Sequence, residues 1–369
     1  FLLTHLEHRN PGRLRELHLR AGELMQSQKQ WDQALDHYLK SGTPDRAAEL
    51  VIDVREELRD AGRWQTLGQW LDMLPETSYA SHPHLIWIKG TVVTETGEPA
   101  RAVELFEQAF QGLVEIADHD TAVRALHDKA VALRFQGHLQ ASLEVLHQLL
   151  DLIEAQTSPP PDIYPLALCQ AGIASTLLGD LEQGNRYLRQ ALDQNEASAS
   201  PFNQATVLDA LGMNLLYSGN LSGAQIQLER ALRLWESIGS PAPIAVTLNN
   251  LGFIHNTRGE HPQALEAYER ALYEARRNGI LRTQAVALAS IGDVHRDTGD
   301  TDKALAAYCV SQSAAEQAAE TQLSVYLLDA AAEIHRRRGD YVQALELARR
   351  AFEWAQEHNT TVDLGRSAT

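Results

Sequence analysis

The stretch that decides the fold lies between residues 248 and 272. It reads Leu248-Asn249-Asn250-Leu251-Gly252, then Gly259-Glu260, then Ala264-Leu265-Glu266-Ala267-Tyr268-Glu269-Arg270-Ala271-Leu272. Gly259 separates two segments of helical pattern, as a glycine does just beyond a helix C-terminus. The small Gly252 in the first segment and the large Tyr268 in the second suit two closely packed helices. The stretch therefore predicts a pair of helices joined by a short turn.

This pattern recurs along the chain with a period of about forty residues. Turn glycines follow one another at intervals of 40, 42, 40, 40, 40 and 40 residues, at Gly97, Gly137, Gly179, Gly219, Gly259, Gly299 and Gly339. Seven residues before each glycine stands a small residue: Gly90, Ala130, Gly172, Gly212, Gly252, Gly292 and Ala332. Nine residues after most of them stands a large one: Phe106, Leu146, Leu188, Leu228, Tyr268 and Tyr308. The recurrence predicts an all-α chain of about seven helix pairs.

Composition and charge exclude several classes of function. The chain of 369 residues carries 32 Lys and Arg against 49 Asp and Glu, a net charge of −17, which argues against nucleic acid or an anionic membrane as a partner. Its two cysteines, Cys169 and Cys309, provide no disulfide framework and no cysteine-based metal site, so we expect a cytoplasmic protein. No apolar run has the length of a membrane span.

The repeated residues resemble the tetratricopeptide repeat (TPR), whose paired helices carry Gly or Ala in the first helix and Ala, Tyr or Phe, then Ala in the second. The resemblance covers about three quarters of the chain and implies a right-handed α-solenoid superhelix. The period of 40 exceeds the usual 34, so we expect longer helices. Repeats of this length resemble those of the maltose-regulon activator and kinesin light chain families.

Prolines mark the turns between successive repeats. Ser158-Pro159-Pro160-Pro161, Ser200-Pro201 and Ser240-Pro241-Ala242-Pro243 lie where one pair ends and the next begins, and Pro161 or Pro201 is expected to start the following helix. The competing interpretation is a proline-rich linker between independent domains, but the repeat phase continues through the triple proline. We predict a divergent helical segment over 1–80, the repeats over 81–358 and a disordered tail over 359–369.

The first eighty residues resemble a helical region that precedes such repeats in one family. Gly22 and Ala34 indicate one more helix pair, and Thr66 to Pro75 reads Thr-Leu-x-x-Trp-Leu-x-x-Leu-Pro. This order resembles the region after the nucleotide-binding and winged-helix modules of MalT-like signal-transduction ATPases, the STAND class. The resemblance implies a sensor arm that binds an inducer and controls ATP-driven oligomerisation, often with a LuxR-type DNA-binding effector. The chain has no phosphate loop, so ATP and Mg²⁺ are expected only in an upstream module. The absent N-terminal Met suggests a fragment, and residues 1–10 would then end the winged-helix module.

The first helix of each TPR pair lines the concave groove, and this makes groove-facing positions predictable. The candidate ligand-binding residues are Phe135, Cys169, Ile173, Leu177, Asp209, Met213, Leu216, Tyr217, Asn249, Asn250, Phe253, Asp293 and Arg296. The middle of the groove would be apolar, with Asp209, Asn249 and Asn250 as polar anchors. An exposed apolar strip favours a peptide, a partner helix or a small inducer. The alternative is that these side chains pack against a tighter superhelical turn.

Three further patterns lie outside the predicted groove residues: recurring histidines, a run of arginines and an apolar face of the last helix. His255, His295 and His335 recur every 40 residues, but equivalent positions of successive repeats are too far apart to share one metal ion, so packing is favoured. Arg336-Arg337-Arg338 suits the C-terminal end of a helix, with a phosphate or acidic partner as the alternative. The outer face of the last helix, including Leu345, Phe352 and Trp354, is expected to contact a missing segment or a second copy.

The functional expectation is recognition without catalysis. No nucleophile-elbow or zinc-protease motif occurs, and no Cys-His signature is present. The favoured hypothesis is the sensor domain of a STAND regulator, which binds a protein, peptide or small molecule and no nucleic acid or membrane. The alternative is a free-standing TPR scaffold for protein–protein interactions. Self-association of the full-length protein is expected in the first case.

Overall fold

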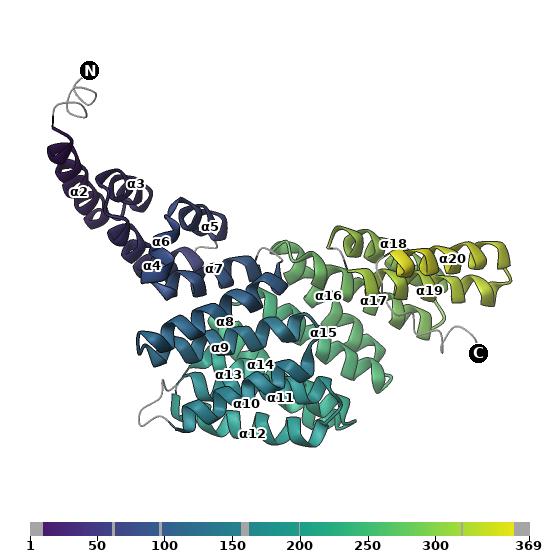
Figure 1. The fold of residues 1–369 in the computed structure, drawn as a ribbon. Helices are drawn as coiled ribbons and strands as arrows, with labels where there is room; N and C mark the ends of the chain where they lie inside the picture. The colour runs from purple at the N-terminus through teal and green to yellow at the C-terminus, as the bar shows by residue number, and fades with distance from the viewer. Residues whose placement is uncertain are drawn as a thin grey trace. The chain divides into compact units, whose positions relative to one another are not determined.

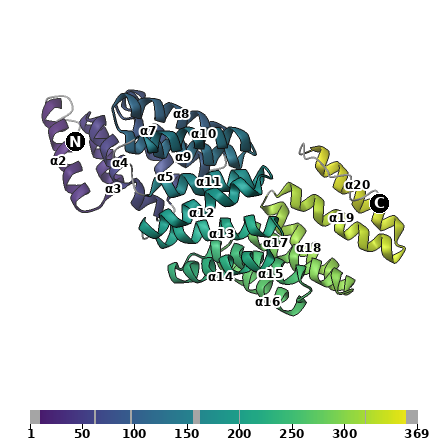
Figure 2. The ribbon, with the colours of Figure 1, turned by 90° about the horizontal axis from the view of Figure 1, so that it is seen from below.

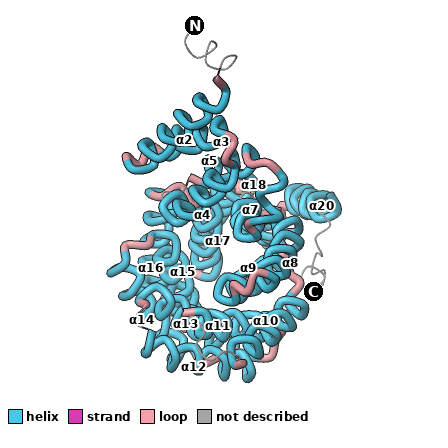
Figure 3. Tube along the Cα trace, turned by 60° about the vertical axis from the view of Figure 1, so that its left-hand side comes forward, coloured by secondary structure: helices cyan, strands magenta, loops and turns pink. Residues whose placement is uncertain are grey.

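The computed structural model describes residues 10–60, 63–95, 98–155, 162–198, 200–318 and 320–357. Within these ranges the regular elements are α-helices without any strand, so the all-α prediction is confirmed (Figures 1 and 3). None of the described helices has both the length and the apolar character needed to cross a membrane. The predictions for Gly97, for the triple proline, for the start of the chain up to residue 9 and for the tail lie outside the described residues.

The described helices follow one another in two groups. Before the repeats come α2 (Pro11–Ser27), α3 (Trp31–Ser41), α4 (Pro44–Asp60), α5 (Trp64–Met73) and α6 (Glu76–Ser81). Seven consecutive pairs follow in the described residues: α7 (Pro83–Glu95) and α8 (Pro99–Glu115), α9 (His119–Phe135) and α10 (Leu139–Glu154), α11 (Ile163–Leu177) and α12 (Leu181–Ser198), α13 (Pro201–Tyr217) and α14 (Leu221–Ile238), α15 (Pro241–Thr257) and α16 (His261–Arg277), α17 (Leu281–Asp297) and α18 (Thr301–Gln317), α19 (Thr321–Arg338) and α20 (Tyr341–Glu357).

Contacts divide the chain into two units, Phe1–Ala191 and Leu192–Thr369, and the division falls within α12. In the first unit α4, α5 and α6 all contact α7, so the N-terminal helices pack directly onto the first repeat. The domain boundary at residue 80 therefore stays a prediction from sequence.

Each glycine of the first helix provides the space for a large side chain of the second. A Cβ added at Gly252 would lie 2.6 Å from Cε1 of Tyr268, and one at Gly90 would lie 2.6 Å from Cε1 of Phe106. The same relation joins Gly172 to Leu188, Gly212 to Leu228 and Gly292 to Tyr308. The predicted packing of small against large residues is thus confirmed in these pairs. It also holds in α2 and α3, where a Cβ at Gly22 would lie 2.8 Å from the ring of Tyr38.

In the pairs from α9–α10 to α19–α20, the turn glycine that follows the first helix has a left-handed conformation. Gly259 has φ +74°, and its N–H donates to the carbonyl of Asn256 at 2.9 Å. The N–H of the next residue, Glu260, donates to the carbonyl of His255 at 2.9 Å. These bonds satisfy carbonyls that the helix leaves without a partner at its end. Because positive φ strains most other residues, glycine favours a turn at these positions.

Two layers of helices form within each unit. In the second unit α13 contacts α15, α15 contacts α17 and α17 contacts α19, and each of them also packs on even-numbered neighbours (Figure 2). Among the described residues of the repeats, α7 to α20, no two even-numbered helices make comparable contacts. The odd-numbered helices are therefore the closer-packed inner layer of the unit. In the first unit α9 and α11 are related in the same way.

Candidate ligand-binding face

The inner layer of the second unit exposes large apolar side chains on two neighbouring helices. Tyr217 at the end of α13 is 57% exposed, and Phe253 on α15 is 50% exposed. Met213 and Leu216 are partly buried beside Tyr217 on α13. The α13–α15 face is defined here by these residues with their polar neighbours: Met213, Leu216, Tyr217, Val246, Asn249, Asn250 and Phe253.

Val246 belongs to this face, and sequence reasoning missed it. It is 46% exposed and lies seven residues before Phe253, two helical turns away on the same side of α15. The predicted groove positions of α15 began with Asn249, three residues before the small residue Gly252, whereas Val246 lies six residues before it. Continuing the predicted positions by one more helical turn toward the N-terminus of α15 would have included Val246.

Asp209 connects three helices. Thr247 Oγ1 on α15 donates to Asp209 Oδ1 at 2.8 Å, and Trp235 Nε1 on α14 donates to Asp209 Oδ2 at 2.6 Å. Burial raises the pKa of Asp209 to about 6, although the two hydrogen bonds favour the ionised form. Since both oxygens accept bonds from the protein, Asp209 acts on the face by positioning α13 against α14 and α15.

The amides of α15 provide the polar part of the face. Asn249 and Asn250 are partly buried, and they precede the exposed Phe253 by one turn. Ser290 Oγ on α17 donates to Asn249 Oδ1 at 3.3 Å, a long bond that leaves the amide NH₂ group of Asn249 as a donor. Two adjacent amides offer both donors and acceptors, as the backbone of an extended peptide requires.

Asp293 and Arg296 meet in a network that joins α17, α18 and α19. Asp293 Oδ1 accepts from Tyr308 at 2.6 Å and from Tyr326 at 2.5 Å, and Arg296 Nη1 lies 2.9 Å from the same oxygen. Burial, reinforced by the nearby Asp293 charge, raises the pKa of Tyr326 to about 12. Both residues were predicted for the groove, and the structure brings them together. The two tyrosines, which came from other parts of the repeat, were missed.

The predicted groove residues of the first unit, on α9 and α11, differ from one another in their exposure. Phe135 on α9 and Leu177 on α11 are exposed, and Ile173 is partly buried. Cys169 is 0% exposed, so its assignment to the open groove is wrong. Arg134, whose guanidinium lies 4.5 Å from the ring centroid of Phe135, donates to Gln170 at 3.2 Å across the two helices.

The recurring histidines lie at the turns. His255 Nδ1 is 2.6 Å from Glu260 Oε2, and His335 Nδ1 is 3.5 Å from Asp340 Oδ2. His255 and His335 thus each contact an acidic residue just beyond the turn glycine of their own pair. In the described part of the chain no three His, Cys, Asp or Glu side chains converge as metal ligands would.

The three consecutive arginines of α19 contact acidic and hydroxyl groups. Arg336 and Arg337 each lie 2.6 Å from Glu333 on the same helix, and Arg338 lies 2.7 Å from Asp302 on α18. The hydrogen bonds from Arg336 and Arg337 lower the pKa of Glu333 to about 2. These cations are thus engaged within the protein.

The outer face of α20 is apolar, but its composition differs from the expectation. Leu345 is 73% exposed and Phe352 is also exposed, as predicted. Trp354 is partly buried against the cluster of Val325, Leu328 and Ala351, so its assignment to the outer face is wrong. The exposed Tyr341 and Val342, near the start of α20, were missed.

Comparison with known proteins identifies the repeat and the fold. Residues 243–317 match the family model described as Tetratricopeptide repeat. No match was found among curated proteins. A Rap protein complexed with Competence and Sporulation Factor is similar over 94% of this chain and 98% of its own, with TM-score 0.65 and 14% identity. The apo form of RapI is similar over 75% of this chain and 98% of its own, with TM-score 0.59 and 14% identity.

A third solved structure is a STAND protein with a tetratricopeptide repeat sensor from Pyrococcus horikoshii. The similarity covers 93% of this chain, with TM-score 0.62 and 15% identity, and this chain spans 53% of that protein's length. At such identities the likeness concerns the fold alone. Residues 243–317 are thus a match to the tetratricopeptide repeat, within a chain whose helical-repeat fold is similar to those of Rap proteins and of a STAND protein's sensor.

Proposed function

We propose that this chain is the non-catalytic sensor segment of a STAND-class regulator, and that its second unit binds the inducer on the α13–α15 face. The observation that carries the proposal is the exposure of Tyr217, Val246 and Phe253 on two neighbouring inner helices. Packing within a solenoid does not require large apolar side chains on its open side, so their exposure favours a binding role.

The chemistry of the face favours a peptide or a protein segment as the inducer. Tyr217 and Phe253 supply apolar contact area, and the side-chain amides of Asn249 and Asn250 supply hydrogen-bond donors and acceptors. The similarity to a Rap protein in complex with Competence and Sporulation Factor supports a ligand-responsive role for this fold. The similarity to a STAND protein's TPR sensor supports the proposed place in a larger regulator.

The mechanism we propose uses binding energy and no chemical step. The inducer binds the activated state of the full-length protein more tightly than the resting state, and its affinity difference shifts the population toward ATP-driven oligomerisation. Control of transcription through a LuxR-type effector would follow from that shift. ATP and Mg²⁺ belong to an upstream module in this scheme.

The second candidate is a free-standing interaction scaffold. It is favoured by the coverage of 98% of the Rap chain, because that similarity extends over nearly the whole of a separate protein. The reading frame upstream of Phe1 separates the two candidates. A phosphate loop followed by a winged helix would support the sensor, and a start codon immediately upstream would support the scaffold.

The binding role is tested with a displayed library of random short peptides, selected on the full chain. We expect enriched peptides to bind the double variant Tyr217→Ser/Phe253→Ser at least about tenfold more weakly, since both anchors are lost. The matched control is Ile226→Ser, which removes an equally exposed apolar residue from α14. Equal affinity for the double variant, or recovery of no peptide at all, would refute a peptide-binding role of this face.

A further inference from the structure

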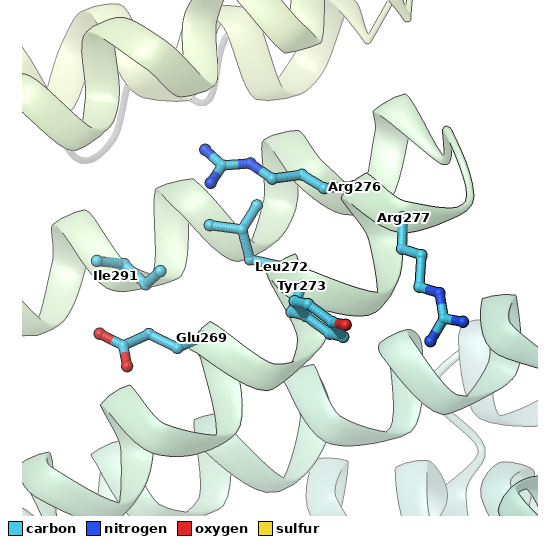
Figure 4. A pocket seen from close by; sticks show the side chains of 6 residues that line it. All are labelled: Glu269, Leu272, Tyr273, Arg276, Arg277 and Ile291. Atoms are coloured by element: carbon cyan, nitrogen blue, oxygen red, sulfur yellow. The ribbon is translucent and has the colours of Figure 1, made fainter.

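A separate recess lies along α16, away from the α13–α15 face. It has a volume of about 590 Å³ and is lined by Glu269, Leu272, Tyr273, Arg276 and Arg277 of α16 and by Ile291 of α17 (Figure 4). This volume falls within the range of small-molecule sites. Neither the repeat pattern nor the proposed function accounts for the combination of side chains here.

The floor of the recess is apolar and fixed. Leu272 is 8% exposed and belongs to a core cluster with Leu248, Ala271 and Leu288, against which Ile291 packs. Floor residues held by a packed core keep their positions when a ligand enters. An apolar ligand group that covers this floor would remove apolar surface from water, which is favourable.

Two arginines contribute cationic groups to the rim of the recess. Arg276 and Arg277 are both exposed, and neither guanidinium forms an ion pair with a described residue. In Figure 4 the Arg276 side chain extends over Leu272, the Arg277 side chain points away from it, and Glu269 lies on the side of Ile291. The C-terminal end of a helix favours cations, but it does not account for Tyr273, which is 61% exposed beside them.

We propose that this recess binds an apolar carboxylate. The aryl or alkyl group contacts Leu272, Ile291 and Tyr273, and the carboxylate pairs with Arg276 or Arg277, whose guanidinium donors match its geometry. Glu269 repels a carboxylate that approaches its own part of the lining, so the carboxylate is favoured beside the arginines. The carboxyl group comes either from a small metabolite or from a peptide C-terminus. This site does not depend on the proposed function of the α13–α15 face.

The test uses the full chain with labelled isoleucine δ1-methyl groups and 4-phenylbutanoate as the probe. The Ile291 signal is assigned with Ile291→Val. We expect a saturable shift of this signal, with an affinity at least about tenfold higher for 4-phenylbutanoate than for the neutral 4-phenylbutan-1-ol. An Ile291 signal that stays unchanged at about 10 mM probe, or equal affinity for acid and alcohol, would overturn the proposal.

The cation requirement is tested with Arg276→Gln/Arg277→Gln, which should weaken binding at least about tenfold. The control is Arg270→Gln, on the same helix but outside the recess, where the arginine pairs with Glu236 at 3.3 Å. Equal weakening in both proteins, after thermal unfolding has shown that both fold, would contradict a role for the rim.

The source of the carboxyl group is resolved with a tripeptide, acetyl-Ala-Leu-Phe, compared with its C-terminal amide. Tighter binding of the tripeptide acid than of 4-phenylbutanoate, lost in the amide, would assign the site to a chain terminus. Tighter binding of 4-phenylbutanoate would assign it to a small molecule. Both results support the carboxylate site, and equal binding of the tripeptide acid and its amide would count against a chain terminus as the source.

Discussion

Asp209 shows how one carboxylate can hold three helices together at the cost of its own ionisation. It accepts hydrogen bonds from Trp235 on α14 and Thr247 on α15, yet burial raises its pKa to about 6. A raised pKa in the folded state means that folding favours the protonated acid. The stability from this group is therefore complete below the ordinary pKa of 3.8 and is lost as the pH rises through about 6.

We predict that Asp209→Asn flattens this part of the pH dependence. A pKa shift from 3.8 to about 6 corresponds to roughly 3 kcal/mol of stability that the wild-type protein loses, relative to the variant, between about pH 4 and pH 7. Urea unfolding of both proteins across this range measures the difference. Parallel profiles would show that Asp209 titrates normally in the folded protein.

The sequence predicted the exposure of single side chains correctly at some positions of the repeat and wrongly at others. Phe253, one residue after the small residue, and Tyr217, five after it, are exposed as expected, and their place in a ligand-binding groove stays a prediction. The position three residues before it varies between repeats: Cys169 and Ala289 are buried, whereas Asn249 is only partly buried. The partners of Asp209 lie 26 and 38 residues away in sequence, and a local period cannot reveal such contacts.

At the scale of helix pairs, the contact between Gly252 of α15 and Tyr268 of α16 has almost no spare room. Tyr268 is buried, and a Cβ at Gly252 would lie 2.6 Å from its Cε1 atom. We predict that Gly252→Ala destabilises the chain by about 1 to 2 kcal/mol, because the strain of overpacking exceeds the gain in helix propensity. Chemical denaturation measures this loss. An unchanged or raised midpoint would contradict it.

The natural pair in α9 and α10 provides the design of a rescue. There Ala130 stands at the position of Gly252 and Leu146 at that of Tyr268, and both are buried. Tyr268→Leu combined with Gly252→Ala should therefore recover at least about 0.5 kcal/mol relative to the sum of the single variants. Additive single effects would show that the two positions do not interact.

The start of α13 and the positions of the turn glycines could be predicted from the sequence, because local chemistry determines them. Ser200 accepts a hydrogen bond from Asn203 N–H at 3.3 Å, and α13 begins at Pro201 as expected from the proline. Gly137, Gly179, Gly219, Gly259, Gly299 and Gly339 all have positive φ. The division of contacts within α12 was not predicted, because no change in composition or repeat phase marks it.

At the scale of the whole molecule, the helix pairs within each unit contact mainly their neighbours along the chain. Stability in such an array is approximately a sum of local terms, so damage in one repeat spreads only to adjacent ones. We predict that Gly252→Ala raises amide hydrogen exchange in α14 to α17 and leaves α2 and α3 unchanged. Mass spectrometry of exchanged peptides measures this. A uniform increase along the chain would indicate global unfolding instead.

The left-handed turn glycines have a consequence for the chirality of the chain. A Cβ at Gly219, Gly259 or Gly299 would meet no atom within 4 Å, so the requirement for glycine there comes from positive φ alone. D-Alanine favours this backbone region, and a semisynthetic chain with D-alanine at one such turn should gain about 0.4 to 1 kcal/mol through a less flexible unfolded state. L-Alanine at the same turn should lose stability instead. The forty-residue period of this protein is therefore also a period in backbone handedness.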